Sequence, residues 1–158
     1  MGMEIERKFT VGEDWSVPAG DGVRIRQGYL SVDPARTVRV RLAGDRGFLT
    51  VKGKTEGACR PEYEYEIPFD DAAEMLGALC DRPAVEKVRY RVPYGGKTWE
   101  VDVFEGGNAG LRLAEVELDN PGEVVKPPPW AGAEVTSDPR FQNVNLYLSP
   151  FASWRPEG

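Results

Sequence analysis

Apolar and polar residues alternate one by one along most of this chain, and this period of two restricts the fold more than any other feature. Such alternation places apolar side chains on one face of a β-strand and polar side chains on the other. Eight stretches show it, at residues 4–9, 22–31, 37–42, 48–54, 60–67, 86–92, 98–104 and 113–119. Short turn-forming segments separate several of them, which predicts antiparallel neighbours.

One stretch has a helical period instead. Asp71 and Glu74 are spaced as a capping box, so we expect a helix that starts from Asp71 and ends near Cys80. Its apolar stripe would consist of residues at i, i+3, i+4 and i+7. These are Ala72, Met75, Leu76 and Leu79.

The alternation fails beyond residue 120. A proline-rich run at 126–130 predicts a stiff extended segment, and residues 139–148 are expected to hold a short helix. We expect the tail from Pro150 to wrap the surface. A length of 158 residues suits one domain.

Charged residues occupy the polar face of almost every predicted strand, and their sign is segregated by strand. The basic sets are Arg24/Arg26, Arg39/Arg41, Lys52/Lys54 and Lys87/Arg89/Arg91. The acidic sets are Glu62/Glu64/Glu66, Glu100/Asp102 and Glu115/Glu117. A barrel or sandwich with a dry core and a wet exterior also alternates, and the pattern alone favours it. A solvated face usually mixes signs, however. The segregation therefore indicates external counter-charges: hard cations for the carboxylates and a polyanion for the basic residues.

The composition excludes several kinds of chemistry. The chain has no histidine, which removes Ser-His-Asp triads and histidine zinc sites. Its net charge of −6 argues against a nucleic-acid partner. Cys59 and Cys80 form no CxxC motif and suit a reducing compartment. No signal peptide or long apolar run is evident, so we expect a cytoplasmic protein without a membrane partner.

A series of short motifs makes the chain resemble one family. The residues Glu-Ile-Glu-Arg-Lys-Phe at 4–9 resemble the N-terminal ExExK signature of the CYTH domain, or triphosphate tunnel metalloenzyme, family. Further segments similar to the family's motifs follow in the family's order. They are QGYL at 27–30, RxR at 39–41, LTxKG at 49–53, RxExE at 60–64, ExDxF at 100–104, AExEL at 114–118 and EVTxDxRYxN at 134–143. Phe141 stands where the closing motif has tyrosine.

The resemblance implies a mainly β (α+β) fold. The expected architecture is an eight-stranded antiparallel closed β-barrel, a tunnel with a charged interior and a few outer helices. This places the charges inside and reverses the interpretation that the pattern alone favours. The barrel would span about residues 3–119 and a C-terminal wrap about 120–158, in one domain over 1–158. One clear helix cannot cover a whole apolar exterior, so we expect the C-terminal segment and a homodimer to cover the rest.

The same resemblance implies a site that binds a triphosphate-containing small molecule together with Mg²⁺ or Mn²⁺. The metal ligands would be Glu4, Glu6, Glu115 and Glu117, with Asp102 close by. The substrate-binding residues would be Lys8, Arg39, Arg41, Lys52, Lys87, Arg89 and Arg91. The expected catalytic residues are Lys8, Tyr29, Glu62 and Glu64. Carboxylates around Lys8 favour its charged form, so a phosphate clamp suits it better than a general base. Glu62 and Glu64 would hold a second metal or position the water, and Tyr29 either positions the substrate or packs in the core.

Three functions follow from these expectations. The leading one is a divalent-metal-dependent hydrolase that converts inorganic tripolyphosphate to pyrophosphate and orthophosphate. The alternatives are a class IV-type adenylate cyclase or a thiamine triphosphatase on the same fold, and a non-catalytic module that binds polyphosphate or nucleotides. Retention of the acidic strands favours an enzyme, because an anion binder has no use for them.

Overall fold

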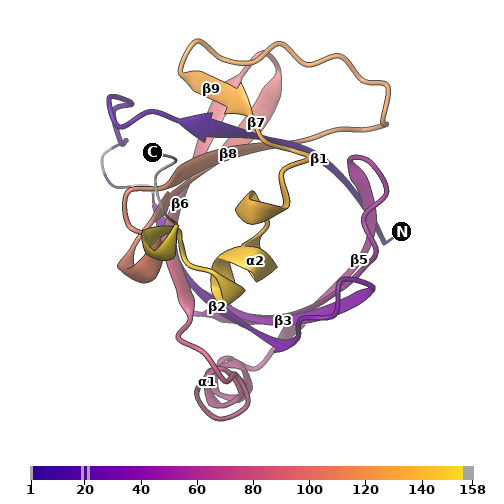
Figure 1. Ribbon diagram of the computed structural model, residues 1–158, viewed down its shortest axis with the longest axis vertical. Coiled ribbons are helices and arrows are strands. Elements are labelled where there is room, and N and C mark those ends of the chain that lie inside the picture. The colour runs from indigo at the N-terminus through magenta and orange to yellow at the C-terminus, as the bar shows by residue number, and fades with distance from the viewer. Residues whose placement is uncertain (1, 19, 21, 155–158) are drawn as a thin grey trace.

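The strands of this chain close into a barrel, shown in Figure 1 as a computed structural model that describes residues 2–18, 20 and 22–154. The barrel strands are β1 (Met3–Val11), β2 (Val23–Ser31), β3 (Arg36–Ala43), β4 (Arg46–Gly53), β5 (Cys59–Ile67), β6 (Val85–Tyr94), β7 (Lys97–Phe104) and β8 (Arg112–Glu117). They are ordered β5-β4-β3-β2-β6-β7-β8-β1, and antiparallel pairing of β1 with β5 closes the ring. The predicted eight-stranded closed antiparallel barrel is confirmed.

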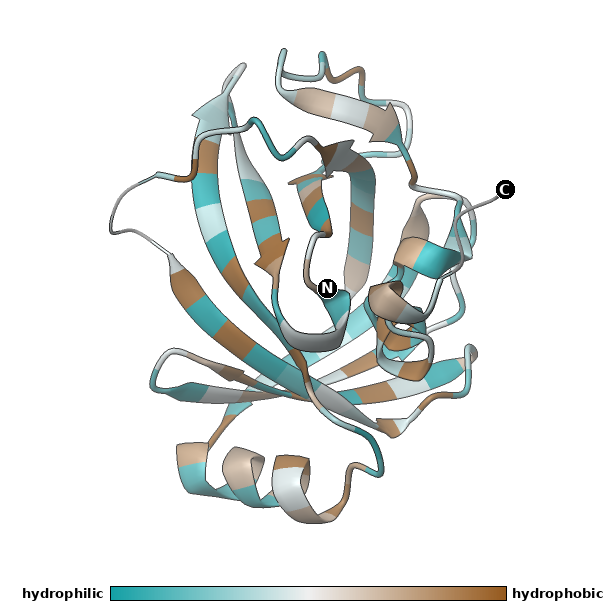
Figure 2. Cartoon of the chain, turned by 60° about the vertical axis from the view of Figure 1, so that its left-hand side comes forward, coloured by the Kyte–Doolittle hydropathy of each residue, from teal (hydrophilic) through white to brown (hydrophobic). Residues whose placement is uncertain are grey.

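Alternating hydrophilic and hydrophobic bands run along the strands in Figure 2, as the period of two requires. The inward-facing rows change character along their length. Val85, Phe104 and Leu113 continue the rows that carry the inward charges, and together with Tyr29 they pack with helix α2 (Asn143–Leu148) in one buried cluster. The charges thus occupy one part of the interior, and an apolar core fills the other.

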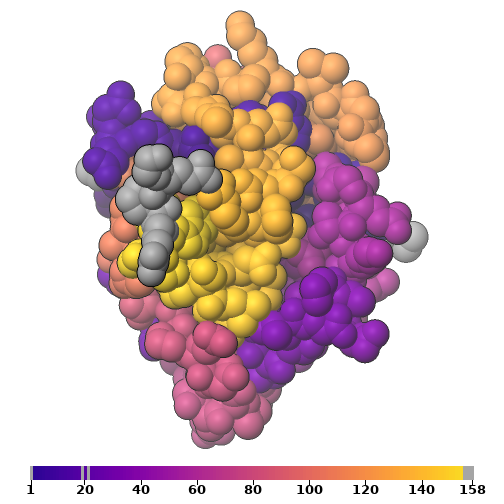
Figure 3. Space-filling model, viewed as in Figure 1, coloured from indigo at the N-terminus to yellow at the C-terminus, as the bar shows by residue number. Residues whose placement is uncertain are grey.

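The C-terminal segment closes the apolar end of the barrel. In Figure 1 α2 lies across the ring of strands, and Figure 3 shows this segment covering that end of the molecule. It follows a short strand, β9 (Ala131–Glu134), and a 3₁₀ turn, η2 (Pro139–Phe141). Two further 3₁₀ turns are η1 (Gly106–Asn108) and η3 (Phe151–Ser153). The short helix expected within 139–148 is present. The strand β9 was not predicted, and the last part of the expected surface wrap, 155–158, lies outside the described residues.

Helix α1 (Phe69–Ala78) begins two residues before the predicted cap. Pro68 precedes it, and no side chain makes the N-terminal cap hydrogen bond. A proline suits this position because its fixed φ leads into a helix and its missing N–H would have no helical partner. The prediction of Asp71 as the cap was therefore wrong. Leu79 also lies outside the helix and is exposed.

The chain itself covers much of the apolar outer face. Helix α1 buries Ala72 and Leu76 against β3 residues such as Val40. Over β1, β7 and β8, Trp130 of the 119–130 connection packs on Trp99, which also contacts Phe9, in a second cluster. Exposed apolar residues remain on β1 and β5, namely Met3, Tyr63 and Tyr65. A homodimer stays a prediction, with a smaller face to cover.

Among the described residues, no helix is both long and apolar enough to cross a lipid bilayer.

Candidate functional site

Basic and acidic strands lie next to each other in the barrel, so many inward charges are neutralised by the neighbouring strand. Lys52 on β4 lies opposite Glu62 on β5, and Arg89 on β6 lies opposite Asp102 on β7. Lys8 on β1 lies opposite Glu115 on β8. The inference that each run of like charge needs an external counter-charge was therefore too broad.

Strand β3 has an excess of positive charge. Arg39 lies opposite Tyr29 and Thr50 and reaches Glu64 Oε1 at 3.5 Å, whereas Arg41 lies opposite Gln27 and has no ion pair within the described residues. The Nε atom of Arg39 is buried and has no hydrogen-bond partner. Burial together with the charges of Arg39 and Arg89 lowers the pKa of Arg41 to about 9, which leaves it charged at neutral pH. This part of the interior is arranged to receive an anion.

Strands β1, β7 and β8 have the opposite excess. Glu6 lies opposite Glu117, and Glu100 lies opposite Glu115. Burial and the charges of Glu115 and Glu4 raise the pKa of Glu6 well above its ordinary value. Burial and the neighbouring Glu4 likewise raise the pKa of Glu62 to about 7. Burial and the neighbouring carboxylates thus outweigh the opposing effects of Lys8 on Glu6 and of Lys52 on Glu62.

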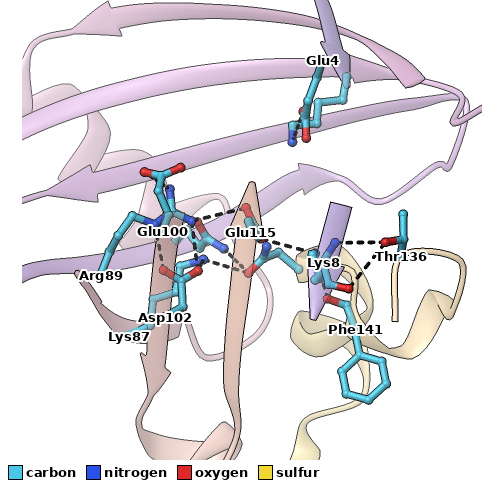
Figure 4. A network of polar contacts seen from close by, with 12 residues as sticks. Glu4, Lys8, Lys87, Arg89, Glu100, Asp102, Glu115, Thr136 and Phe141 are labelled. Carbon is cyan, nitrogen blue, oxygen red and sulfur yellow. Dashed lines mark hydrogen bonds and ion pairs between the residues drawn. The ribbon is translucent and has the colours of Figure 1, made fainter. Parts of the chain in front are cut away.

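A chain of ion pairs lies beneath these two regions (Figure 4). Asp102 accepts two hydrogen bonds from Arg89, at 2.7 and 2.9 Å, and its Oδ2 lies 2.7 Å from the Nζ of Lys87. Glu115 Oε1 lies 3.4 Å from the Nζ of Lys8, and its Oε2 lies 3.9 Å from Arg89. Burial opposes the charge on Glu115, but Lys8 and Arg89 keep its pKa well below the ordinary value. The three cations of this chain of ion pairs, Lys8, Lys87 and Arg89, are thus each paired with a carboxylate.

Backbone and amide groups of the C-terminal segment complete this network. Lys8 donates from Nζ to the carbonyl of Phe141 at 3.1 Å. Arg41 donates to Gln27 Oε1 at 2.8 Å, and Gln27 donates in turn to Asn143 Oδ1 at 3.0 Å. Asn143 Oδ1 also accepts a hydrogen bond from Lys87 at 3.1 Å. Gln27 and Asn143 were absent from the predicted site, because neutral amides stand outside a charge pattern, although both lie in motifs of the resemblance.

Two adjoining cavities open onto these groups. The larger has a volume of about 850 Å³, within the range of small-molecule sites. Of the predicted site residues, it is lined by Glu4, Glu6, Arg39, Arg41, Lys52, Glu62, Glu64, Arg89, Arg91, Glu115 and Glu117. The smaller is lined by Glu4, Glu6, Lys8, Tyr29, Arg39 and Lys52. Lys87 and Asp102 line neither cavity and act from behind the wall.

On strand β2 the charged residues lie on the outer face of the barrel, whereas the family resemblance predicts charges inside it. Arg24 and Arg26 point outward and pair with Glu105 and Glu86. The inward positions include Tyr29, which is buried, lies 5.4 Å from the ring of Tyr147 between centroids and also lines the smaller cavity. Both expectations for Tyr29, packing and access to the site, agree with this placement.

The carboxylates fit a hard divalent cation by chemistry. Glu4, Glu6, Glu115 and Glu117 supply oxygen ligands, and burial together with the charges of Glu115 and Glu4 raises the pKa of Glu6. Within the described ranges, however, no three acidic or cysteine side chains are arranged to hold an ion. Lys52 Nζ lies 2.6 Å from Glu4 Oε2, so the ammonium group occupies the position that a metal ion would take beside this carboxylate. Four of the predicted metal residues are gathered in one cavity without forming a ready-made metal centre, and the fifth, Asp102, lines neither cavity.

Comparison with known proteins gives consistent matches over the chain. The family described as CYTH domain matches residues 2–145. An inorganic triphosphatase of Acetivibrio thermocellus is 49% identical over 155 residues, 98% of this chain and 99% of that protein. An inorganic triphosphatase of Nitrosomonas europaea is 40% identical over 154 residues, 92% of this chain and 97% of that protein. The crystal structure of an inorganic triphosphatase superposes with a TM-score of 0.65 at 38% identity, covering 92% of this chain and 98% of the other.

Proposed function

This chain belongs to the CYTH domain family, and from that premise we propose that it is a metal-dependent hydrolase of inorganic triphosphate. The observation that carries the proposal is the cavity of about 850 Å³. Its lining has excess positive charge on β3, from arginines, and excess negative charge on β1, β7 and β8, from carboxylates. A short chain of phosphates with a divalent cation supplies both missing counter-charges. The two inorganic triphosphatases at 49% and 40% identity support this substrate.

The cations of the cavity would hold the phosphate oxygens. Arg39, Arg41, Arg89 and Arg91 offer planar donor groups for two-point contacts, and Lys8 and Lys52 offer point charges. Lys87 would act indirectly, since it lines neither cavity and contacts Asp102 and Asn143. Asp102 would serve chiefly to fix Lys87 and Arg89, because its carboxylate already binds both.

The carboxylates on the other side of the cavity would hold the metal. We assign Glu4, Glu6, Glu115 and Glu117 to this role and Mg²⁺ or Mn²⁺ as the ion. When bound, a divalent ion neutralises phosphate charge and lowers the pKa of water.

Hydrolysis of inorganic triphosphate needs positioning and charge neutralisation more than covalent chemistry. The oxygen of a water molecule attacks the terminal phosphorus, the bond to the bridging oxygen breaks, and pyrophosphate leaves with that electron pair. The water proton passes to a nearby base. Glu62 and Glu64 line the cavity and would orient this water, and a pKa of about 7 lets Glu62 accept its proton near neutrality.

A product assay tests the proposal. The purified chain is given Mg²⁺ or Mn²⁺ and, in parallel, tripolyphosphate, ATP or thiamine triphosphate. We expect orthophosphate and pyrophosphate chiefly from tripolyphosphate. Cyclic AMP from ATP would instead assign an adenylate cyclase, preferred hydrolysis of thiamine triphosphate would change the substrate, and binding without turnover would leave a non-catalytic module.

A matched pair of variants ties this activity to the cavity. Arg39→Gln removes an inward arginine, whereas Arg24→Gln removes an arginine that points outward and pairs with Glu105. We expect Arg39→Gln to lose most activity and Arg24→Gln to keep it. Equal activity in the two variants would place the reaction elsewhere.

A further inference from the structure

We propose that Asn143 contacts the substrate directly, donating its side-chain amide to a phosphate oxygen where the two cavities meet. This inference rests on the proposed function and adds a neutral substrate-binding residue to the charged ones. It also gives the C-terminal segment a part in substrate recognition besides closing the barrel.

The position of Asn143 is the first part of the case. Five residues line both cavities: Glu4, Glu6, Arg39, Lys52 and Asn143. Four of them are charged, and Asn143 is the neutral one. A phosphate chain that reaches from the larger cavity into the smaller one passes these five side chains.

The orientation of the amide is fixed by two donors. Gln27 Nε2 and Lys87 Nζ both donate to Asn143 Oδ1, at 3.0 and 3.1 Å. A lysine ammonium has no acceptor, so the atom that faces Lys87 is the oxygen and the opposite atom is Nδ2. Lys87 and Gln27 are fully buried, which holds this arrangement in place.

The Nδ2 group is left free to bind a ligand. It makes no hydrogen bond with any residue in the described ranges. The atom is also accessible, because it is absent from the buried side-chain atoms without a partner. Asn143 lines both cavities, and because its oxygen is engaged by Gln27 and Lys87, Nδ2 is the amide atom available to a substrate there.

A direct test observes the amide without catalysis. Sodium tripolyphosphate is titrated into ¹⁵N-labelled protein with EDTA present, and the Nδ2 protons of Asn143 are followed by NMR. We expect a downfield shift of these protons that saturates together with the shifts of the cavity backbone. Backbone shifts with an unmoved Asn143 amide would overturn this inference alone. No shift anywhere in the chain would also overturn this inference, and the product assay with Mg²⁺ or Mn²⁺ would then decide the proposed function separately.

A set of variants separates donation to substrate from support of Lys87. N143D keeps an oxygen for Lys87 and Gln27 and loses the donor, so a purely structural role predicts a normal KM. We expect instead a KM for tripolyphosphate raised about tenfold or more, as for a lost hydrogen bond to a charged group, with the melting temperature retained.

Two controls accompany N143D. Q142E adds the same negative charge at the neighbouring residue, which lines the smaller cavity, and leaves the Asn143 amide intact. N145A removes a structural hydrogen bond of α2, from Nδ2 of Asn145 to the carbonyl of Pro139. We expect a clearly smaller rise in KM for Q142E and a normal KM for N145A. A KM for N143D equal to that of the wild type or of Q142E would refute the role of the amide.

Discussion

Lys87 and Asp102 form an ion pair that solvent does not reach: Nζ lies 2.7 Å from Oδ2, and the side chains are 0% and 1% exposed. Asp102 also binds Arg89, so one carboxylate balances two buried cations. Removing it with Asp102→Asn leaves buried charge without compensation. We expect a loss of about 3–5 kcal/mol in the free energy of unfolding, measured by urea denaturation.

The control for this prediction is an ion pair on the surface. Arg24 and Glu105 are 60% and 39% exposed. Glu105→Gln is expected to change the free energy of unfolding by no more than about 1 kcal/mol, because water screens such pairs. Similar losses in both variants would mean that burial does not determine the effect.

Glu117 separates the requirements of activity from those of stability. It is exposed at the cavity, faces the like-charged Glu6 across the strands, and has no ion pair within the described residues. We expect Glu117→Gln to lower phosphate release by about a hundredfold or more while changing the free energy of unfolding by less than about 0.5 kcal/mol. Glu66→Gln, on the surface beside Arg46, is the control and should keep full activity. An active Glu117→Gln would remove this residue from the metal ligands.

Cation binding should release protons near neutral pH. The pKa of Glu6 is raised by burial and by Glu115 and Glu4, and the pKa of Glu62 is raised to about 7 by burial and by Glu4. A divalent cation favours the charged carboxylates and lowers both pKa values, so protons leave as it binds. The affinity for Mg²⁺ should therefore rise as the pH increases through about 7. Calorimetry in two buffers of different ionisation enthalpy measures the release, and an identical heat in both buffers would contradict it.

The closing helix should contribute strongly to stability through its apolar side. Leu146 is fully buried in the cluster that joins α2 to the barrel. We expect Leu146→Ala to cost about 2–5 kcal/mol, from lost burial and the cavity that remains. Leu79→Ala is the matched control, since Leu79 is 63% exposed and should cost less than about 0.5 kcal/mol. Thermal or urea unfolding distinguishes the two, and a mild effect at Leu146 would show that α2 packs loosely.

The strands could be predicted because their period of two reflects the backbone itself. The pattern alone could not tell which face is interior, since charges inside and charges outside give the same alternation; the ordered motifs decided that point. Strand β9, with the sequence Ala-Gly-Ala-Glu, carries no alternation. It forms because β5 pairs only with Met3–Ile5 of β1, which leaves the edge at Phe9–Val11 available. Helix α1 starts directly after Pro68, close to the end of β5. The capping pattern at Asp71 contains no information about either feature.

The site could be predicted by residue type but not by contact. Lys8, Arg39 and Glu115 carry charge at inward positions, and a sequence shows this directly. The order of the strands determines which charges neutralise one another. Local sequence does not reveal the pairing of strands that are not consecutive, such as β2 and β6. Gln27 and Asn143 meet only because α2 enters the barrel from the far end of the chain.

The junction of the first strand with the end of the chain has a consequence for how the protein is made. The carbonyl of Lys8 accepts a hydrogen bond from Val135, and its ammonium donates to Phe141. A nascent chain that has emerged from the ribosome through β8 holds all eight barrel strands but lacks both partners of Lys8 and the helix that closes the barrel. Contacts this distant in sequence form late and slowly. Assembly of this network therefore finishes only after α2 has been synthesised, so a translation product interrupted between β8 and α2 has a barrel with an incomplete interior.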